Sequence, residues 1–89
     1  MTKVEQIINS IRSTLKEFTK PEQKIFIDNV NKVVVHTVPD SVHINMMHIF
    51  ITLYDNDNYA YYDEHFYHHP NIDITMAPIM FTINKYYRG

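Results

Sequence analysis

The residues with the most versatile chemistry gather in one short segment, where three histidines follow two acidic residues. The segment reads Asp63-Glu64-His65-Phe66-Tyr67-His68-His69. Imidazole nitrogens bind zinc, nickel and copper, and carboxylates can complete such a site. In a strand, however, His65 and His68 point to opposite faces of the sheet, and Pro70 ends the strand. We therefore expect no metal site, and we expect solvated histidines at the end of a hairpin.

An acidic segment, Asp55-Asn56-Asp57-Asn58, invites comparison with a calcium-binding loop. An EF-hand loop needs Gly at its sixth position and Glu at its twelfth. Counted from Asp55, these positions hold Ala60 and Phe66. Asn and Asp tolerate the positive φ that a tight hairpin requires, so the segment predicts a turn and not a metal site.

The sequence lacks the usual settings for covalent catalysis. It has no Cys, and its one Gly is the last residue, so it offers neither a thiol nucleophile nor a glycine-flanked serine. Ser41 and His43 share strand parity, but such a pair is common by chance. The histidines and tyrosines permit acid–base chemistry without indicating it. We expect a protein that is not an enzyme and that uses no cofactor.

Seven Tyr and five Phe in a chain without Trp are the strongest remaining signal. Tyr59, Tyr61 and Tyr67 share one face of a predicted strand and could stack nucleic-acid bases. Against this, Asp63 lies in the same row, and the formal net charge of -2 offers no attraction to phosphates. Exposed tyrosines beside acidic residues are typical of a protein contact surface. The predicted partner-binding residues are Tyr54, Asp55, Asp57, Tyr59, Tyr61, Asp63, Glu64 and Tyr67.

The length and composition of the chain limit the type of fold in which these residues can lie. Eighty-nine residues, of which 45% are hydrophobic and 20% charged, favour a single globular domain over residues 1–89. No apolar run approaches the roughly 20 residues of a membrane span, and no signal-like block begins the chain. We expect a soluble cytoplasmic protein without disulfides or membrane contact.

The first predicted element is an amphipathic helix at residues 3–18. Apolar residues recur there at spacings of three and four, and polar residues fill the other side. Thr2 and Glu5 form a capping box that marks its start. A second start signal, the segment Thr19-Lys20-Pro21-Glu22, predicts another helix at 20–31.

Extended segments are predicted over the rest of the chain. Alternating and β-branched residues indicate strands at 32–38, 43–54 and 59–67, separated by turns rich in Asn, Asp and Pro. The segment 72–87 is predicted as a last strand, and its apolar parity changes at Ala77-Pro78, where a bulge would restore it. The expected fold is α+β, with two N-terminal helices packed on a three- to four-stranded antiparallel meander sheet.

The function that these patterns favour is non-catalytic protein binding through a sheet face or edge. The abundance of Ile, Asn and Lys is typical of an AT-rich genome, such as that of a phage. We therefore expect a phage- or virus-encoded inhibitor or modulator of a host or defence protein, acting in the host cytoplasm. The alternatives are a self-assembling structural protein and a small metal- or nucleic-acid-binding regulator. We also expect a homodimer in which Tyr61, Tyr62 or Tyr67 lies at the interface, beside an unprotected strand edge.

Overall fold

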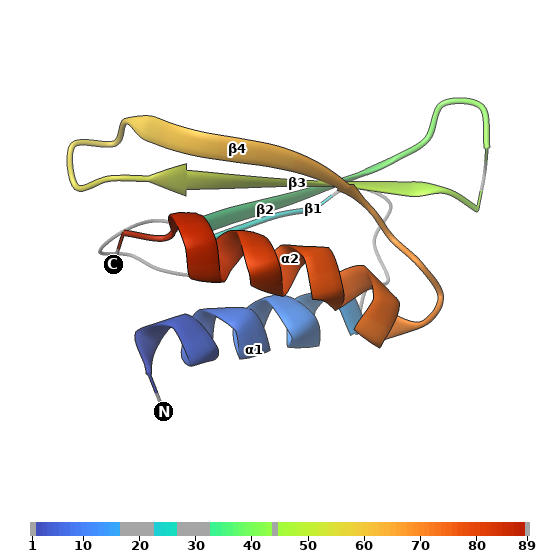
Figure 1. Cartoon of the computed structure of the whole chain (residues 1–89). Helices are drawn as coiled ribbons and strands as arrows, with labels where there is room; N and C mark the ends of the chain where they lie inside the picture. Colours follow the sequence, from blue (N-terminus) through green and yellow to red (C-terminus); the bar gives the residue numbers. More distant parts are fainter. Residues whose placement is uncertain (1, 17–22, 27–32, 44, 89) are drawn as a thin grey trace.

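The fold is given by a computed structural model that describes residues 2–16, 23–26, 33–43 and 45–88. Its elements are α1 (Lys3–Lys16), β1 (Gln23–Phe26), β2 (Val33–Pro39), β3 (Met47–Tyr54), β4 (Ala60–Tyr67) and α2 (Ile72–Tyr86) (Figure 1). Both helices lie on the same side of the sheet, and within the described ranges neither is long and apolar enough to cross a membrane. The structure confirms an α+β fold with an antiparallel sheet, but it places one helix before the strands and one after them.

The sheet is a four-stranded antiparallel meander in the order β1-β2-β3-β4. The β3–β4 register is regular apart from an irregularity at Leu53-Tyr54. In the hairpin that follows, the Asp55 side chain accepts a 3.0 Å hydrogen bond from the backbone N–H of Tyr59. Asn58 has a φ of 63°, which Asn tolerates better than most residues, so the predicted turn at 55–58 is confirmed.

The first helix, α1, begins and packs as the sequence predicts. The backbone N–H of Glu5 donates a 3.1 Å hydrogen bond to the side-chain oxygen of Thr2, which confirms the capping box. The predicted apolar stripe is buried: Ile7, Ile8, Ile11 and Leu15. The helix is described as far as Lys16, and the last two predicted helical residues, 17 and 18, lie outside the described residues.

The hydrophobic core lies between the sheet and the two helices. The sheet contributes alternate residues of its strands: Val33, Val35, Ile49, Ile51, Leu53 and Phe66. The helices contribute Ile7, Ile8, Ile11 and Leu15 from α1, and Met76, Ile79 and Ile83 from α2. Because successive side chains of a strand point to opposite faces, the alternate residues of β2, β3 and β4 lie on the other face, which no described helix covers.

The second predicted helix, at 20–31, is wrong. Gln23–Phe26 forms β1, which pairs antiparallel with β2, while 20–22 and 27–31 lie outside the described residues. The capping signal acts locally, whereas the three valines at 33–35 in β2 offer a β-branched strand edge. Pairing with that edge overrides the local helix signal, as tertiary contacts commonly do.

The strand predicted over 72–87 is also wrong, because this segment forms α2. Asn71 caps the helix: its side-chain oxygen accepts a 2.9 Å hydrogen bond from the backbone N–H of Asp73. Buried residues recur at helical spacing: Thr75, Met76, Ile79, Thr82 and Ile83. The change of parity at Ala77-Pro78 is therefore the period of a helix and not a bulge. Pro78 lies inside the helix and is exposed.

The third strand, β3, is shorter than predicted. The strand expected over 43–54 begins at Met47, because the residues before it form a turn. A 2.9 Å hydrogen bond from the Asp40 N–H to the Met46 carbonyl closes this turn. Strands β2 and β4 begin within one residue of their predicted positions.

Candidate functional site

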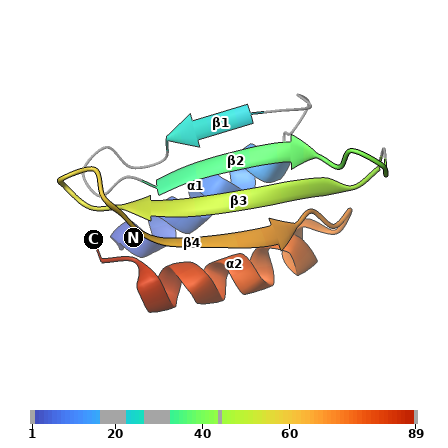
Figure 2. The ribbon, with the colours of Figure 1, turned by 90° about the horizontal axis from the view of Figure 1, so that it is seen from above.

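The face of the sheet turned away from the helices carries the candidate site. Alternate residues of three strands lie on this surface, which we call the open face: Val34, which is 3% exposed, and His36, Val38, His48, Phe50, Thr52, Asp63, His65 and Tyr67. The register places Phe50 between His36 and His65, and the neighbouring row places His48 between Val38 and Tyr67. Seen from above, the strands lie in front of α1, and α2 runs along β4 (Figure 2).

Aromatic and imidazole rings form a continuous layer on the open face. The Phe50 ring stacks on the His65 ring, with centroids 4.7 Å apart and an interplanar angle of 15°. The His65 centroid lies 4.8 Å from that of His48 and 4.6 Å from that of Tyr67. Phe50 is 39% exposed and Tyr67 is 56% exposed, so the rings contact one another and still present surface to solvent.

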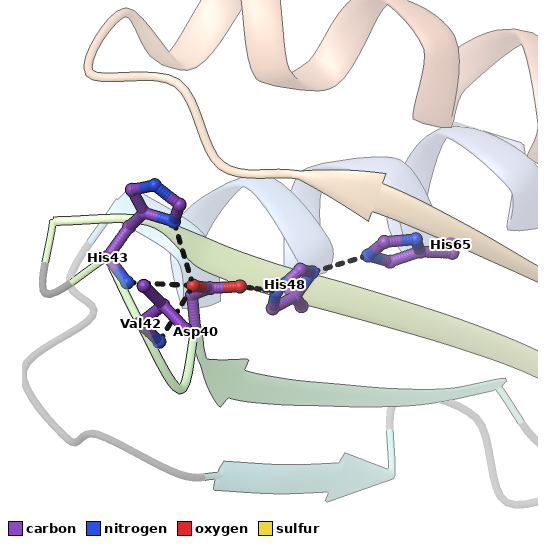
Figure 3. Close-up of polar contacts among 5 residues, drawn as sticks. All are labelled: Asp40, Val42, His43, His48 and His65. Carbon is purple, nitrogen blue, oxygen red and sulfur yellow. Dashed lines mark hydrogen bonds and ion pairs between the residues drawn. The ribbon is translucent and has the colours of Figure 1, made fainter.

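A chain of hydrogen bonds crosses this layer from the β2–β3 turn to β4 (Figure 3). Asp40 Oδ1 lies 2.7 Å from His48 Nε2, and His48 Nδ1 lies 2.7 Å from His65 Nε2. The first residue comes from the turn, the second from β3 and the third from β4. This Asp40–His48–His65 chain therefore joins three parts of the fold on one surface.

The β2–β3 turn holds Asp40 at the start of the chain. Its Oδ2 accepts hydrogen bonds from the backbone N–H groups of Val42 and His43, at 3.0 and 2.8 Å, and lies 3.1 Å from His43 Nδ1 (Figure 3). The backbone N–H of His43, followed by the His48 side chain, holds the pKa of Asp40 well below its usual range. Asp40 is therefore an ionised carboxylate whose two oxygens are both engaged.

The carboxylate fixes one proton position in the chain. An ionised carboxylate only accepts hydrogen bonds, so His48 carries a proton on Nε2 and donates it to Asp40. The bond between His48 Nδ1 and His65 Nε2 has one donor and one acceptor, and the direction of donation depends on the tautomers of the two rings. Nδ1 of His65, an exposed residue, lies at the far end of the chain.

The carboxylate and first imidazole are arranged as in a catalytic triad, but the third member is of a different kind. In a triad, the imidazole oriented by the carboxylate takes a proton from a hydroxyl or a thiol. Here the corresponding nitrogen of His48 faces the imidazole of His65. A cavity of about 280 Å³ does occur, but it is lined by Leu15, Lys16, His68, Pro70 and Ile72 and does not include the chain. The hydrogen bonds of this arrangement hold the His48 and His65 rings in fixed orientations on the open face.

The histidines that cluster in the sequence separate in the structure. His65 lies on the open face, whereas His69 lies between β4 and α2, where its Nδ1 accepts the backbone N–H of Asn71. The histidine that meets His65 is His48, 17 positions away. His65 is thus not the purely solvated hairpin residue that the sequence predicts. In the part of the chain that the structure describes, no group of three or more His, Asp or Glu could hold a metal ion.

The predicted partner-binding residues divide among four places. Asp63 and Tyr67 lie on the open face. Tyr54 ends β3, where it pairs with Ala60. Three others lie in the hairpin turn: Asp55, Asp57 and Tyr59, the last of them 74% exposed.

The remaining two predicted residues, Tyr61 and Glu64, join β4 to α2 and its C-terminal extension. The Tyr61 hydroxyl accepts the backbone N–H of Arg88 at 3.1 Å, and the Arg88 guanidinium lies 4.4 Å from the centre of the Tyr61 ring. Glu64 accepts hydrogen bonds from the hydroxyls of Tyr62 and Thr82. The bond to Glu64, followed by burial, raises the pKa of Tyr62 above its usual range. These side chains already have partners within the chain.

The sequence reasoning missed several members of the site, among them His36, Asp40, His48 and Phe50. Alternation could have found part of it, since His48 and Phe50 alternate with the apolar Ile49 and Ile51 along one strand. The meeting of His48 with His65 needs the strand register as well, and the turn that delivers Asp40 needs its hydrogen bonds.

The fold and site together define a small α+β protein whose antiparallel sheet has helices on one face and a layer of rings on the other. Comparisons with protein-family models, with curated proteins and with solved structures find no match. The geometry of the open face is thus the basis for a functional proposal.

Proposed function

We propose that this chain is a non-catalytic protein-binding module and that it binds its partner with the open face. The observation that supports the proposal is the exposed layer of rings, in which His65 contacts both Phe50 and Tyr67. No described helix covers this layer. Aromatic residues are enriched at the centres of protein interfaces, where they supply much of the binding energy.

The charges around the rings favour a protein over a nucleic acid as the partner. Asp40 and Asp63 lie beside the rings, and the formal net charge of the chain is -2. A phosphate backbone laid on this face would meet carboxylates instead of the cations that bind it. His65 Nδ1 and the Tyr67 hydroxyl offer polar groups that suit the backbone and side chains of a protein.

The Asp40–His48–His65 chain supports binding without catalysis. Its middle imidazole is hydrogen-bonded to a carboxylate and to another imidazole, so its role is to hold the rings in one orientation. We further propose that the module inhibits or modulates a host or defence protein in the host cytoplasm, a proposal supported by the phage-like composition. The alternative, a self-assembling protein, is supported by a different surface, the outer side of α2.

Binding by the open face is tested with paired variants in a pull-down from the cells that naturally contain the protein. The double variant Phe50→Ser/Tyr67→Ser removes two exposed rings and spares the core, so we expect it to lose the specific partner. Tyr59→Ser is the matched control, because Tyr59 is 74% exposed in the hairpin turn and does not belong to the open face. Mass spectrometry identifies the partner, and circular dichroism confirms that both variants fold.

A partner retained equally by the double variant and the control would contradict the proposal, since binding would then lie elsewhere. With the recombinant partner, ring burial should make the affinity nearly independent of salt between about 0.05 and 0.5 M. A steep loss of affinity with salt would instead indicate that charges, and not rings, dominate the contact.

A further inference from the structure

The second helix of the fold, α2, has two apolar sides. One side packs into the core through Met76, Ile79 and Ile83, which are 0% exposed. At about 100° per residue, the opposite side of the helix carries Ile74, Ala77, Pro78, Phe81 and Lys85, all of them exposed. We call these five residues the outer stripe. Surface helices normally turn a polar side to solvent, and a helix that is apolar on both sides is typically buried on both.

The two largest apolar residues of the outer stripe are both exposed to solvent. Ile74 is 54% exposed and Phe81 is 65% exposed. The helix runs along β4 at the border of the sheet, so its outer stripe faces away from the core (Figure 2). Lys85 covers Phe81 only in part, with its ammonium 5.6 Å from the ring centre. Exposed apolar surface of this kind marks an interaction site.

We propose that the outer stripe is the interface of a homodimer, in which α2 packs antiparallel against α2 of a second copy. The two-fold axis passes between Ala77 and Pro78. This arrangement places the small Ala77 opposite Pro78 of the second copy, which allows the helices to approach closely. It places Ile74 opposite Phe81 of the second copy, so that the two largest apolar residues of the stripe cover each other.

The charges of α2 fit this antiparallel arrangement. The first turn of the helix carries Asp73, whose carboxylate pairs with Arg12 of the same chain at 2.6 Å and still has a side chain that is 78% exposed, and the last turn is basic through Lys85. Antiparallel packing brings the acidic end of one helix near the basic end of the other, whereas parallel packing would bring like charges and aligned helix dipoles together. The stripe is therefore complementary to itself in size and charge, which favours a second copy over a foreign protein as the occupant.

The size of the stripe sets the strength of the dimer. From Ile74 to Lys85 the helix rises by about 16 Å, so the contact is a single crossing of two short helices. Interfaces below about 1,200 Å² belong to weak, reversible associations. We therefore infer an equilibrium between monomer and dimer. This interface differs from the tyrosine interface expected from the sequence, because Tyr61 and Tyr62 contact the C-terminal part of the chain itself.

Cysteine cross-linking tests the position of the two-fold axis, because the chain contains no Cys of its own. In Ala77→Cys the two introduced thiols lie across the axis, within the Cα separation of about 4–7 Å that a disulfide spans. Under mild oxidation, this variant should form a covalent dimer at least about tenfold faster than Asp57→Cys, because the dimer raises the local thiol concentration. Asp57 is the matched control, an exposed residue of the hairpin turn.

Sedimentation equilibrium measures the association without a cross-link, over protein concentrations from about 10 µM to about 1 mM. Phe81→Lys places two cations near the axis and should weaken the dimer at least about tenfold. Tyr59→Lys is the control, since Tyr59 is 74% exposed and lies outside the stripe. Both positions are on the surface, so the variants should fold, and circular dichroism checks this.

Three results would each overturn the proposal. The first is a wild-type chain that remains monomeric over the whole concentration range. The second is equal rates of cross-linking for Ala77→Cys and Asp57→Cys. The third is a dimer that persists in Phe81→Lys, and if that dimer is lost in Phe50→Ser/Tyr67→Ser, the interface lies on the open face instead.

Discussion

Replacing Ile79 by Ala should destabilise the protein far more than the same change at Ile74, in the same helix. Ile79 is 0% exposed, whereas Ile74 is 54% exposed on the opposite side of α2. The change removes three carbon atoms, each contributing about 0.8 kcal/mol when buried, so the transfer term at Ile79 is about 2.4 kcal/mol. The cavity left in the core adds to it, for a total loss of about 3–4 kcal/mol in the free energy of unfolding.

At Ile74 two effects oppose each other. About half of the side chain is buried, so the loss of apolar contact is correspondingly smaller. Ala also has the higher helix propensity, which returns up to about 0.5 kcal/mol. We expect the free energy of unfolding of Ile74→Ala to lie within about 1 kcal/mol of the wild-type value.

Thermal unfolding followed by circular dichroism measures both variants. The protein should be dilute, at low micromolar concentration, so that association through α2 does not add to the measured stability. In a domain of this size, 1 kcal/mol corresponds to about 4–8 °C in Tm. Ile79→Ala should therefore melt roughly 12–30 °C below the wild type, and Ile74→Ala within a few degrees of it.

Equal losses at the two positions would refute this reasoning, and a larger loss at Ile74 would favour the strand predicted from the sequence. In that strand Ile74 shares a face with Met76, and Ile79 shares the other face with Phe81 and Ile83. Ile83→Ala and Phe81→Ala form a second pair. Strand alternation predicts similar effects for them, whereas the helix predicts a large effect only at Ile83, which is 0% exposed against 65% for Phe81.

Two further predictions concern the open face. Asp40 has a lowered pKa in the folded protein, so its carboxylate stabilises the fold at pH values above its ordinary pKa of 3.8, and this contribution is lost as the pH falls below that value. Asp40→Asn should accordingly melt below the wild type at pH 7, and the gap should close as the pH falls from about 5 to about 2; a gap that stays constant would contradict this. Protein made without a tag and dialysed should retain less than one equivalent of zinc, nickel or copper, as metal analysis can show. One equivalent that His65→Ala or His68→Ala abolishes would contradict the expectation of no metal site.

The elements predicted correctly are those whose sequence pattern is compatible with only one type of secondary structure. The helix at the N-terminal end combines a capping box with a stripe at spacings of three and four. Strands β2 to β4 combine alternation with turns of Asn, Asp and Pro. In both cases the local propensity and the burial pattern agree, which is the condition under which a pattern specifies an element.

The elements predicted wrongly are those in which two patterns compete. In 72–87 the apolar residues at 72, 74 and 76 imitate alternation, and Pro78 argues against a helix. The helical signal lies in the longer period of Met76, Ile79 and Ile83, and Asn71 supplies the cap. The apparent alternation at 72, 74 and 76 arises because Ile74 is apolar although it belongs to the outer stripe and not to the core. The residue that misled the prediction is therefore an apolar residue whose presence is not explained by burial in the core.

The candidate site was harder to predict than the fold because its members meet through strand register and a turn. His48 and His65 are 17 positions apart, and only the β3–β4 pairing brings their nitrogens together. The sequence cluster at 63–69 drew attention to histidines that the fold then separates. Tyrosine abundance was likewise ambiguous, since Tyr67 is exposed whereas Tyr61 and Tyr62 join β4 to the end of the chain.

The Asp40–His48–His65 chain also explains how the exposed rings could bind without a large loss of side-chain freedom. Immobilising a side chain in an interface costs about 0.5–1.5 kcal/mol. Here the β2–β3 turn fixes Asp40, Asp40 orients His48, and His48 orients His65, against which Phe50 stacks. The rings are ordered when the chain folds, so the proposed partner would meet rings that are already in place. The face that no described helix covers would then be a preorganised binding surface, held by a polar chain that resembles part of a catalytic site.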